Sequence, residues 1–131
     1  MTRVLVTGAN GFIGRALCET LVARGLGVRA AVRSPAAVPG EVRTIGEIGP
    51  ATEWRRVLAH VDTVVHLAAR VHVARETAAD PLAAYRAVNV AGTARLAQEC
   101  AAARVPRLVF VSSIKVNGER TRGVPFDEAD P

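Results

Sequence analysis

Close to its start the sequence reads Val4-Leu5-Val6-Thr7-Gly8-Ala9-Asn10-Gly11-Phe12-Ile13-Gly14. The apolar run at residues 4–6 predicts a short buried strand, and apolar residues then recur at helical spacing. Between a strand and a helix, Gly8 allows a tight turn, Gly11 lets a pyrophosphate approach the backbone, and Gly14 lets the helix pack closely. The free N–H groups at the helix start favour phosphates. The stretch therefore predicts a dinucleotide-binding turn, and a purely structural glycine turn is the alternative.

The end of the second predicted strand indicates which dinucleotide is bound. Dinucleotide sites commonly carry a carboxylate there that grips the adenosine ribose. This sequence has Val32-Arg33-Ser34 instead, and the next acidic residue is Glu41. Arg33 and Ser34 are suited to a 2′-phosphate, which an aspartate would repel. We therefore expect a preference for NADP(H) over NAD(H), with a merely solvent-exposed Arg33 as the alternative.

The rest of the chain continues to alternate between strands and helices. Continuous apolar runs predict further strands at residues 28–32, 42–45, 63–67 and 108–111. The first helix should end at Gly25, a short helix lies around residues 53–58, and a long helix runs from Asp80-Pro81 to Val105-Pro106. One face of that long helix carries Leu82, Tyr85, Val88 or Asn89, Gly92, Leu96 and Cys100. The pattern predicts one α/β domain over residues 1–131, with a doubly wound parallel sheet covered on both faces.

Composition and charge exclude several classes of protein. The 131 residues carry a formal net charge of +5, but the basic residues are scattered and only 4% of residues are aromatic, so we expect no nucleic-acid binding. No apolar run is long enough to span a membrane. His60, His66 and His72 lack metal-ligand spacing, so no metal site is expected, and Cys18 and Cys100 form no disulfide pattern. We expect a cytoplasmic domain in which both cysteines pack as small apolar residues and Trp54 caps the core.

Four motifs together carry a family resemblance. They are the glycine turn beginning at Thr7, His66-Leu67-Ala68-Ala69, Asn89-Val90-Ala91-Gly92-Thr93 and Val111-Ser112-Ser113. In order and spacing they resemble the extended short-chain dehydrogenase/reductase superfamily, in particular its NAD-dependent nucleotide-sugar epimerase/dehydratase family. The resemblance covers essentially the whole chain and implies a Rossmann-type fold that binds NADP or NAD.

The resemblance also implies roles for individual residues. The backbone N–H groups of Phe12 and Ile13 would bind the pyrophosphate, and Glu47 and Ile48 would border the adenine. The cofactor would further be lined by Leu67, Ala68 and Ala69. Asn89, counted with the cofactor-binding residues, would sit beneath the active centre, and an ordinary exposed helix residue is the alternative. His66 would position backbone beside the cofactor, and Arg70 and His72 follow the cofactor-lining turn, where they could face substrate.

Ser113 is the predicted catalytic residue, because the family uses a Ser or Thr here to hydrogen-bond the reacting hydroxyl or carbonyl. The Tyr-x-x-x-Lys pair that completes the family's catalytic centre is absent. The only tyrosine is Tyr85, which is followed four positions later by Asn89, and Lys115 is too close to Ser113 in sequence. We therefore expect the N-terminal part of a longer enzyme, cut before the catalytic helix and the substrate subdomain, and inactive alone.

The local sequences after residues 67 and 111 are most similar to bacterial nucleotide-sugar 4-epimerases and to 4-keto reductases of surface-polysaccharide synthesis. Both transfer hydride at a sugar carbon of a nucleotide diphosphate sugar, so the predicted class spans isomerase and oxidoreductase. An epimerase should retain NAD⁺, whereas a reductase consumes NADPH. The resemblance implies a homodimer for the full-length protein. The alternative is a non-catalytic dinucleotide-binding sensor or interaction module.

Overall fold

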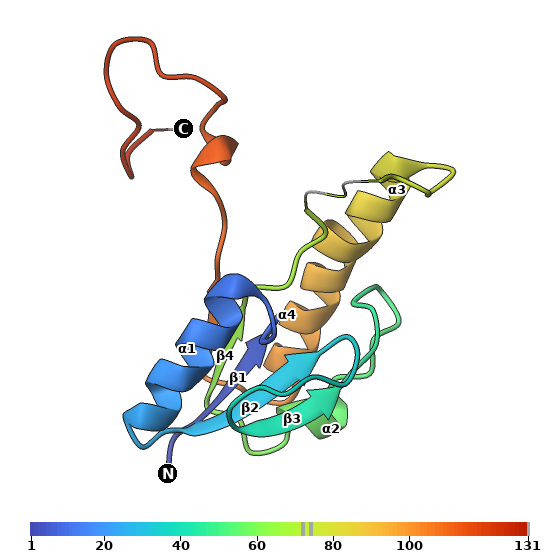
Figure 1. The fold of residues 1–131 in the computed structure, drawn as a ribbon, viewed down its shortest axis with the longest axis vertical. Coiled ribbons are helices and arrows are strands. Elements are labelled where there is room, and N and C mark those ends of the chain that lie inside the picture. Colours follow the sequence, from blue (N-terminus) through green and yellow to red (C-terminus); the bar gives the residue numbers. More distant parts are fainter. Residues whose placement is uncertain (72, 74, 131) are drawn as a thin grey trace.

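The computed structural model describes residues 1–71, 73 and 75–130. Its centre is a parallel sheet with strand order β3-β2-β1-β4-β5, drawn in Figure 1. The strands are β1 (Arg3–Thr7), β2 (Gly27–Val32), β3 (Glu41–Thr44), β4 (Thr63–His66) and β5 (Arg107–Phe110). The predicted doubly wound α/β fold is confirmed. Strand order reverses between β1 and β4, and ligands bind at such switch points beyond the carboxyl ends of the strands.

Helices cover both faces of the sheet. They are α1 (Phe12–Ala23), α2 (Arg55–Leu58), α3 (Pro81–Arg86), a π-helical segment (Ala87–Gly92), α4 (Thr93–Ala102) and a 3₁₀ turn (Ile114–Val116). On one face Val4 and Val6 of β1 belong to a buried cluster with Cys18 of α1. On the other face Leu5 belongs to a cluster with residues of α2 and α4. Successive β1 side chains thus serve opposite layers, as a doubly covered sheet requires.

The predicted helix ends are confirmed where local chemistry decides them. Gly25 has φ +76°, and the N–H of Leu26 donates to the carbonyl of Leu21 (3.1 Å), which closes α1. Asp80 caps α3 by accepting the N–H of Ala83 at 3.0 Å, with Pro81 at the first helical position.

The long helix differs from the prediction of one regular helix. The π-helical segment Ala87–Gly92 interrupts it between α3 and α4. Leu96 and Cys100 are buried as predicted, but Leu82, placed on the same face, is 59% exposed. The reason is visible in Figure 1, where α3 extends past the carboxyl ends of the strands.

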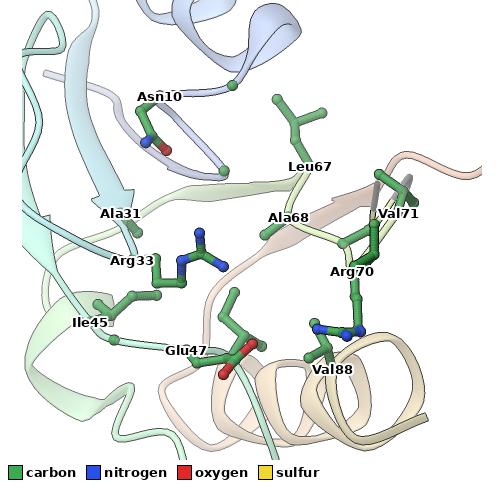
Figure 2. Close-up of a pocket in the computed structure, with 16 residues that line it drawn as sticks. Asn10, Ala31, Arg33, Ile45, Glu47, Leu67, Ala68, Arg70, Val71 and Val88 are labelled. Carbon is green, nitrogen blue, oxygen red and sulfur yellow. The ribbon is translucent and has the colours of Figure 1, made fainter. Parts of the chain in front are cut away.

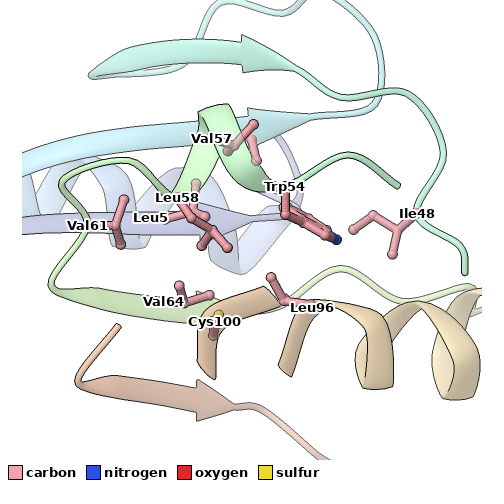
Figure 3. Packing of buried hydrophobic residues seen from close by; sticks show 10 residues of the cluster. Leu5, Ile48, Trp54, Val57, Leu58, Val61, Val64, Leu96 and Cys100 are labelled. Atoms are coloured by element: carbon pink, nitrogen blue, oxygen red, sulfur yellow. The ribbon is translucent and has the colours of Figure 1, made fainter. Parts of the chain in front are cut away.

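Trp54 lies inside the core instead of capping it. Its side chain is fully buried and packs in the cluster with Leu5, Leu58 and Leu96, shown in Figure 3. The cysteines pack as predicted small apolar residues, and burial raises the pKa of the Cys100 thiol to about 11. Side chains of the edge strand β5 are more exposed to solvent, and Phe110 is 56% exposed.

A buried polar chain joins β1, β4 and α4. The Thr7 hydroxyl oxygen accepts the N–H groups of Leu67 (3.1 Å) and Ala68 (3.2 Å). Its own hydrogen is therefore directed to Nδ1 of His66, 2.7 Å away. The neutral ring then carries its proton on Nε2, which donates to the Thr93 hydroxyl at 3.0 Å. These hydrogen bonds fix the backbone that leaves β4.

The hydrogen-bonded series of Thr7, His66 and Thr93 requires a neutral His66 ring. Burial lowers the pKa of His66. Above about pH 6.5 the ring is neutral in both the folded and unfolded states. As the pH falls below that value, the unfolded chain binds a proton that the folded chain resists, so the free energy of unfolding declines until the pH passes the lowered pKa. Urea unfolding at pH 7.5 and 5.5 measures the difference.

The control for this prediction is the exposed His60. His60→Asn should keep the pH dependence, since Asn tolerates the positive φ of +59° at that position. His66→Gln should be less stable at pH 7.5 and should lose its share of the dependence. Equal pH dependence in the unaltered chain and His66→Gln would contradict the role of His66.

Candidate functional site

A cleft of about 450 Å³ lies beyond the carboxyl ends of β1 to β4. Its volume falls in the range of small-molecule sites. Its lining comes from the glycine loop, from the chain around the ends of β2 and β3, from the segment after β4, and from Val88 of the π-helical segment, as Figure 2 shows. The lining residues are Gly8, Asn10, Gly11, Ala31, Arg33, Ile45, Gly46, Glu47, Ile48, Leu67, Ala68, Ala69, Arg70, Val71, Val73 and Val88.

The glycine loop has the close approaches that its spacing predicts. Gly8 has φ +64°, and a Cβ there would lie 2.9 Å from the Ala68 nitrogen, so the loops after β1 and β4 meet at this residue. A Cβ on Gly14 would lie 2.1 Å from the Gly8 oxygen, so only glycine lets α1 pack on the loop. Gly11 lines the cleft and begins the helix.

Phe12 and Ile13 begin α1 and lie outside the lining of the cleft. Their side chains are 98% and 60% exposed and do not line the cleft. Their backbone N–H groups belong to the first turn of α1, where a helix supplies no internal acceptor. They can therefore take part in anion binding only through the backbone, which is the contribution that the sequence implied.

The rim after β2 and β3 carries charges of both signs. Arg33 and Glu47 are exposed and line the cleft, and Figure 2 shows the Arg33 guanidinium directed into it. Beside them, Ile48 is buried at 7% exposure and forms part of the wall. Ser34 is exposed and is not among the lining residues. The structure thus brings Arg33, Glu47 and Ile48 together and leaves Ser34 outside.

The rim after β4 consists of the predicted Leu67, Ala68 and Ala69, followed by Arg70. The Arg70 guanidinium pairs with both carboxylate oxygens of Glu76 at 2.8 and 3.0 Å.

The same guanidinium lies 5.3 Å from the centre of the Tyr85 ring. The pKa of Glu76 is lowered by the N–H of Ala78 and by Arg70. Two contacts therefore hold the Arg70 side chain beside the cleft.

Asn89 and Ser113 are not among the residues that line the cleft. The Asn89 amide is hydrogen-bonded to the backbone of Arg70. Ser113 is exposed, and its hydroxyl accepts the N–H of Lys115 at 3.2 Å at the start of the 3₁₀ turn. His72 lies outside the described residues.

Several lining residues were not predicted from the sequence. Asn10 could have been found, since it stands between two glycines of the loop. Ile45 and Gly46 directly precede the predicted Glu47 and could also have been included. Val88 had no local signal, because its place depends on how the long helix packs under the sheet edge.

Other kinds of site are not supported by the described part of the chain. Among residues 1–71, 73 and 75–130, no three or more His, Cys, Asp or Glu side chains gather in a way that could hold a metal ion. Within the same residues, no helix has the length and apolar character needed to cross a membrane.

The geometry of Gly14 predicts a sharp loss of stability on adding a methyl group. Gly14→Ala should lower the free energy of unfolding by about 3 kcal/mol, because the new Cβ overlaps backbone that cannot move away. Gly49→Ala is the matched control, since a Cβ there meets nothing within 4 Å. Urea unfolding of both variants measures the difference, and equal stabilities would contradict the close packing of the loop.

The chain is similar to known proteins in sequence and in fold. It is 41% identical over 130 residues to a UDP-glucose 4-epimerase of Vibrio cholerae, covering 97% of this chain and 40% of that protein. A short-chain dehydrogenase/reductase superfamily protein of Agrobacterium tumefaciens with bound NAD has a TM-score of 0.82 and 34% identity, over 98% of this chain and 38% of that one.

MoeE5 in complex with UDP-glucuronic acid and NAD has a TM-score of 0.80 and 36% identity, over 98% of this chain and 42% of that one. The chain thus spans about 40% of the length of the relatives that it matches. The model of the NAD dependent epimerase/dehydratase family matches residues 4–131. With that match, the predicted resemblance is confirmed: the chain belongs to the NAD-dependent epimerase/dehydratase family.

Proposed function

We propose that residues 1–131 form the dinucleotide-binding part of a nucleotide-sugar 4-epimerase or 4-keto reductase. The observation that carries the proposal is the glycine loop, which ends β1, begins α1 and lines one side of a cleft of about 450 Å³. A Cβ at Gly8 or Gly14 would overlap backbone, so the loop has the compact shape that lets a pyrophosphate approach. Family membership supports the same cofactor class.

The cleft offers a separate surface for each part of a dinucleotide. The pyrophosphate would lie at Gly8 and Gly11, against the N–H groups of Phe12 and Ile13. The adenosine would lie on the β2 and β3 side, bordered by Glu47 and Ile48. The second nucleoside would lie on the β4 side, against Leu67, Ala68 and Ala69, whose small side chains permit close approach. When bound, the nicotinamide ring supplies a site that accepts or donates hydride.

Arg33 favours NADP(H) over NAD(H) within this proposal. Its side chain lines the adenosine side of the cleft, and no hydrogen bond or ion pair joins it to any residue that the structure describes. A 2′-phosphate would supply that partner, with bidentate geometry available to a guanidinium. The bound NAD of the similar solved structures supports the dinucleotide class and leaves NAD(H) as the alternative.

Calorimetric titration tests the role of Arg33. The unaltered chain should bind NADP⁺ at least as tightly as NAD⁺. Arg33→Ala should weaken NADP⁺ about tenfold and NAD⁺ less than about twofold, since only NADP⁺ loses a charge-assisted pair. Arg24→Ala, which removes an exposed arginine at the far end of α1, is the control. A clear NAD⁺ preference of the unaltered chain would contradict the proposed role of Arg33.

The proposed substrate of the whole protein is a nucleotide diphosphate sugar. The similar Vibrio protein is a UDP-glucose 4-epimerase, and MoeE5 was solved with UDP-glucuronic acid. Ser113 is the proposed hydrogen-bonding partner of the reacting hydroxyl or carbonyl in that whole protein, which we propose to be a homodimer. The Tyr-x-x-x-Lys pair that would exchange the proton is absent from the 131 residues.

The isolated chain should therefore bind cofactor without turning substrate over. We expect no interconversion of UDP-glucose and UDP-galactose and no NAD(P)H consumption with 4-keto sugar nucleotides. Product analysis and absorbance at the nicotinamide band check both reactions. Turnover that persists through purification and disappears in Ser113→Ala would contradict the need for a Tyr/Lys pair.

A dinucleotide-binding sensor is the second candidate function. It is favoured by one observation: the cleft is formed while Ser113 lies outside it, hydrogen-bonded to Lys115. A sensor has no need of a sugar nucleotide. Binding of UDP-glucose by a longer polypeptide that contains residues 1–131 favours the enzyme, and binding of the dinucleotide alone favours the sensor.

A further inference from the structure

One helical segment contacts both rims of the cleft. The π-helical segment Ala87–Gly92 connects α3 to α4, and its Val88 lines the cleft between the rims, as Figure 2 shows. Short π-helical stretches inside α-helices are rare and occur often at functional sites. The two contacts made by this segment are of different kinds, one by hydrogen bonds and one by close packing.

Asn89 holds the rim that follows β4. Its Oδ1 accepts the N–H of Arg70 at 2.8 Å, and its Nδ2 donates to the carbonyl of Arg70 at 3.0 Å. The half-buried amide thus satisfies both backbone groups of one residue, 19 positions away in sequence. Without it, both groups at Arg70 would need other partners, and the direction of the rim would no longer be fixed.

Gly92 lets the helix pack against the opposite rim, which follows β3. A Cβ at Gly92 would lie 2.6 Å from Cγ2 of Ile48 and 3.3 Å from the backbone nitrogen of Gly49. Glycine is therefore the residue that lets the helix reach the segment after β3. Since Ile48 is buried and forms part of the cleft wall, any shift of its side chain changes the wall itself.

We propose that the segment Ala87–Gly92 sets the shape of the cleft, with Asn89 and Gly92 as positioning residues for its two rims. Neither Asn89 nor Gly92 is among the residues that line the cleft. Asn89 fixes the backbone at Arg70 on the β4 side, and Gly92 fixes Ile48 on the β3 side. The assignment rests on the proposed dinucleotide function, in which the β3 side takes the adenosine and the β4 side takes the second nucleoside.

The roles of the two positioning residues, Asn89 and Gly92, can be separated by measuring the binding of two ligands. AMP reaches only the glycine loop and the β3 side, whereas NAD⁺ spans both rims. Asn89→Ala removes the two hydrogen bonds and raises helix propensity, so weaker binding cannot be ascribed to a poorer helix. Gly92→Ala places a methyl group against Ile48. Adding Ile48→Leu to Gly92→Ala removes the branch that bears Cγ2 and gives the space back.

Titrations of NAD⁺ and AMP into the full 131-residue chain, with NMR detection, test the assignment. Asn89→Ala should weaken NAD⁺ about tenfold and AMP less than about twofold. Gly92→Ala should weaken both ligands about tenfold, and the double variant with Ile48→Leu should recover to within about threefold. Gly49→Ala, with open space around its added methyl, should stay within about twofold.

Amide exchange in the free chain tests Asn89 without a ligand. The Arg70 N–H should exchange at least about tenfold faster in Asn89→Ala, because its acceptor is gone. Unchanged Arg70 exchange, equal weakening of AMP and NAD⁺ by Asn89→Ala, or unaltered AMP binding by Gly92→Ala would each overturn the assignment. If the unaltered chain bound neither ligand, the proposed function would be contradicted. The exchange rate of the Arg70 N–H in Asn89→Ala and the chemical shift of the Ile48 methyl groups in Gly92→Ala would still decide the roles of Asn89 and Gly92.

Discussion

The cleft depends on the hydroxyl of Thr7, which joins the two strands at the switch point of the sheet. It accepts the N–H groups of Leu67 and Ala68 and donates to His66, so the backbone leaving β4 is tied to the end of β1. Gly8 follows at once and leaves no room for a side chain against Ala68. The loop that would receive the pyrophosphate and the wall that would receive the second nucleoside are thereby built on one contact.

The remaining walls are held from further away. The long helix passes under the cleft and reaches one rim through Asn89 and the other through Gly92. The core beneath is apolar, with Trp54 and Leu96 fully buried on that face of the sheet. Rigid elements therefore surround a cleft whose lining comes mostly from loops, which is the usual division between scaffold and binding surface.

Most of the fold could be predicted from local patterns, and the exceptions have a common cause. All five strands were found from short runs rich in apolar residues, although Arg29 interrupts the run in β2 and Arg43 the run in β3. The caps at Gly25 and Asp80 were found because cap chemistry is local. The π-helical segment was missed, since periodicity assumes a constant turn and the contacts of Asn89 and Gly92 involve residues distant in sequence. Trp54 was misplaced for the same reason. In the site, the glycines followed from their spacing and the residues after β4 from the family resemblance, but the position of Ser113 and the role of Asn89 depend on how separate parts of the chain meet.

Dinucleotide binding in the glycine-loop cleft is tested most directly by mapping NADP⁺ on the backbone amide NMR spectrum. We expect saturable shifts at Gly8 and Gly11, at Arg33 and Glu47, and at Leu67 to Ala69, with little change along β5. Shifts confined to the segment after β5, or a spectrum unchanged at millimolar NADP⁺ and NAD⁺, would contradict it.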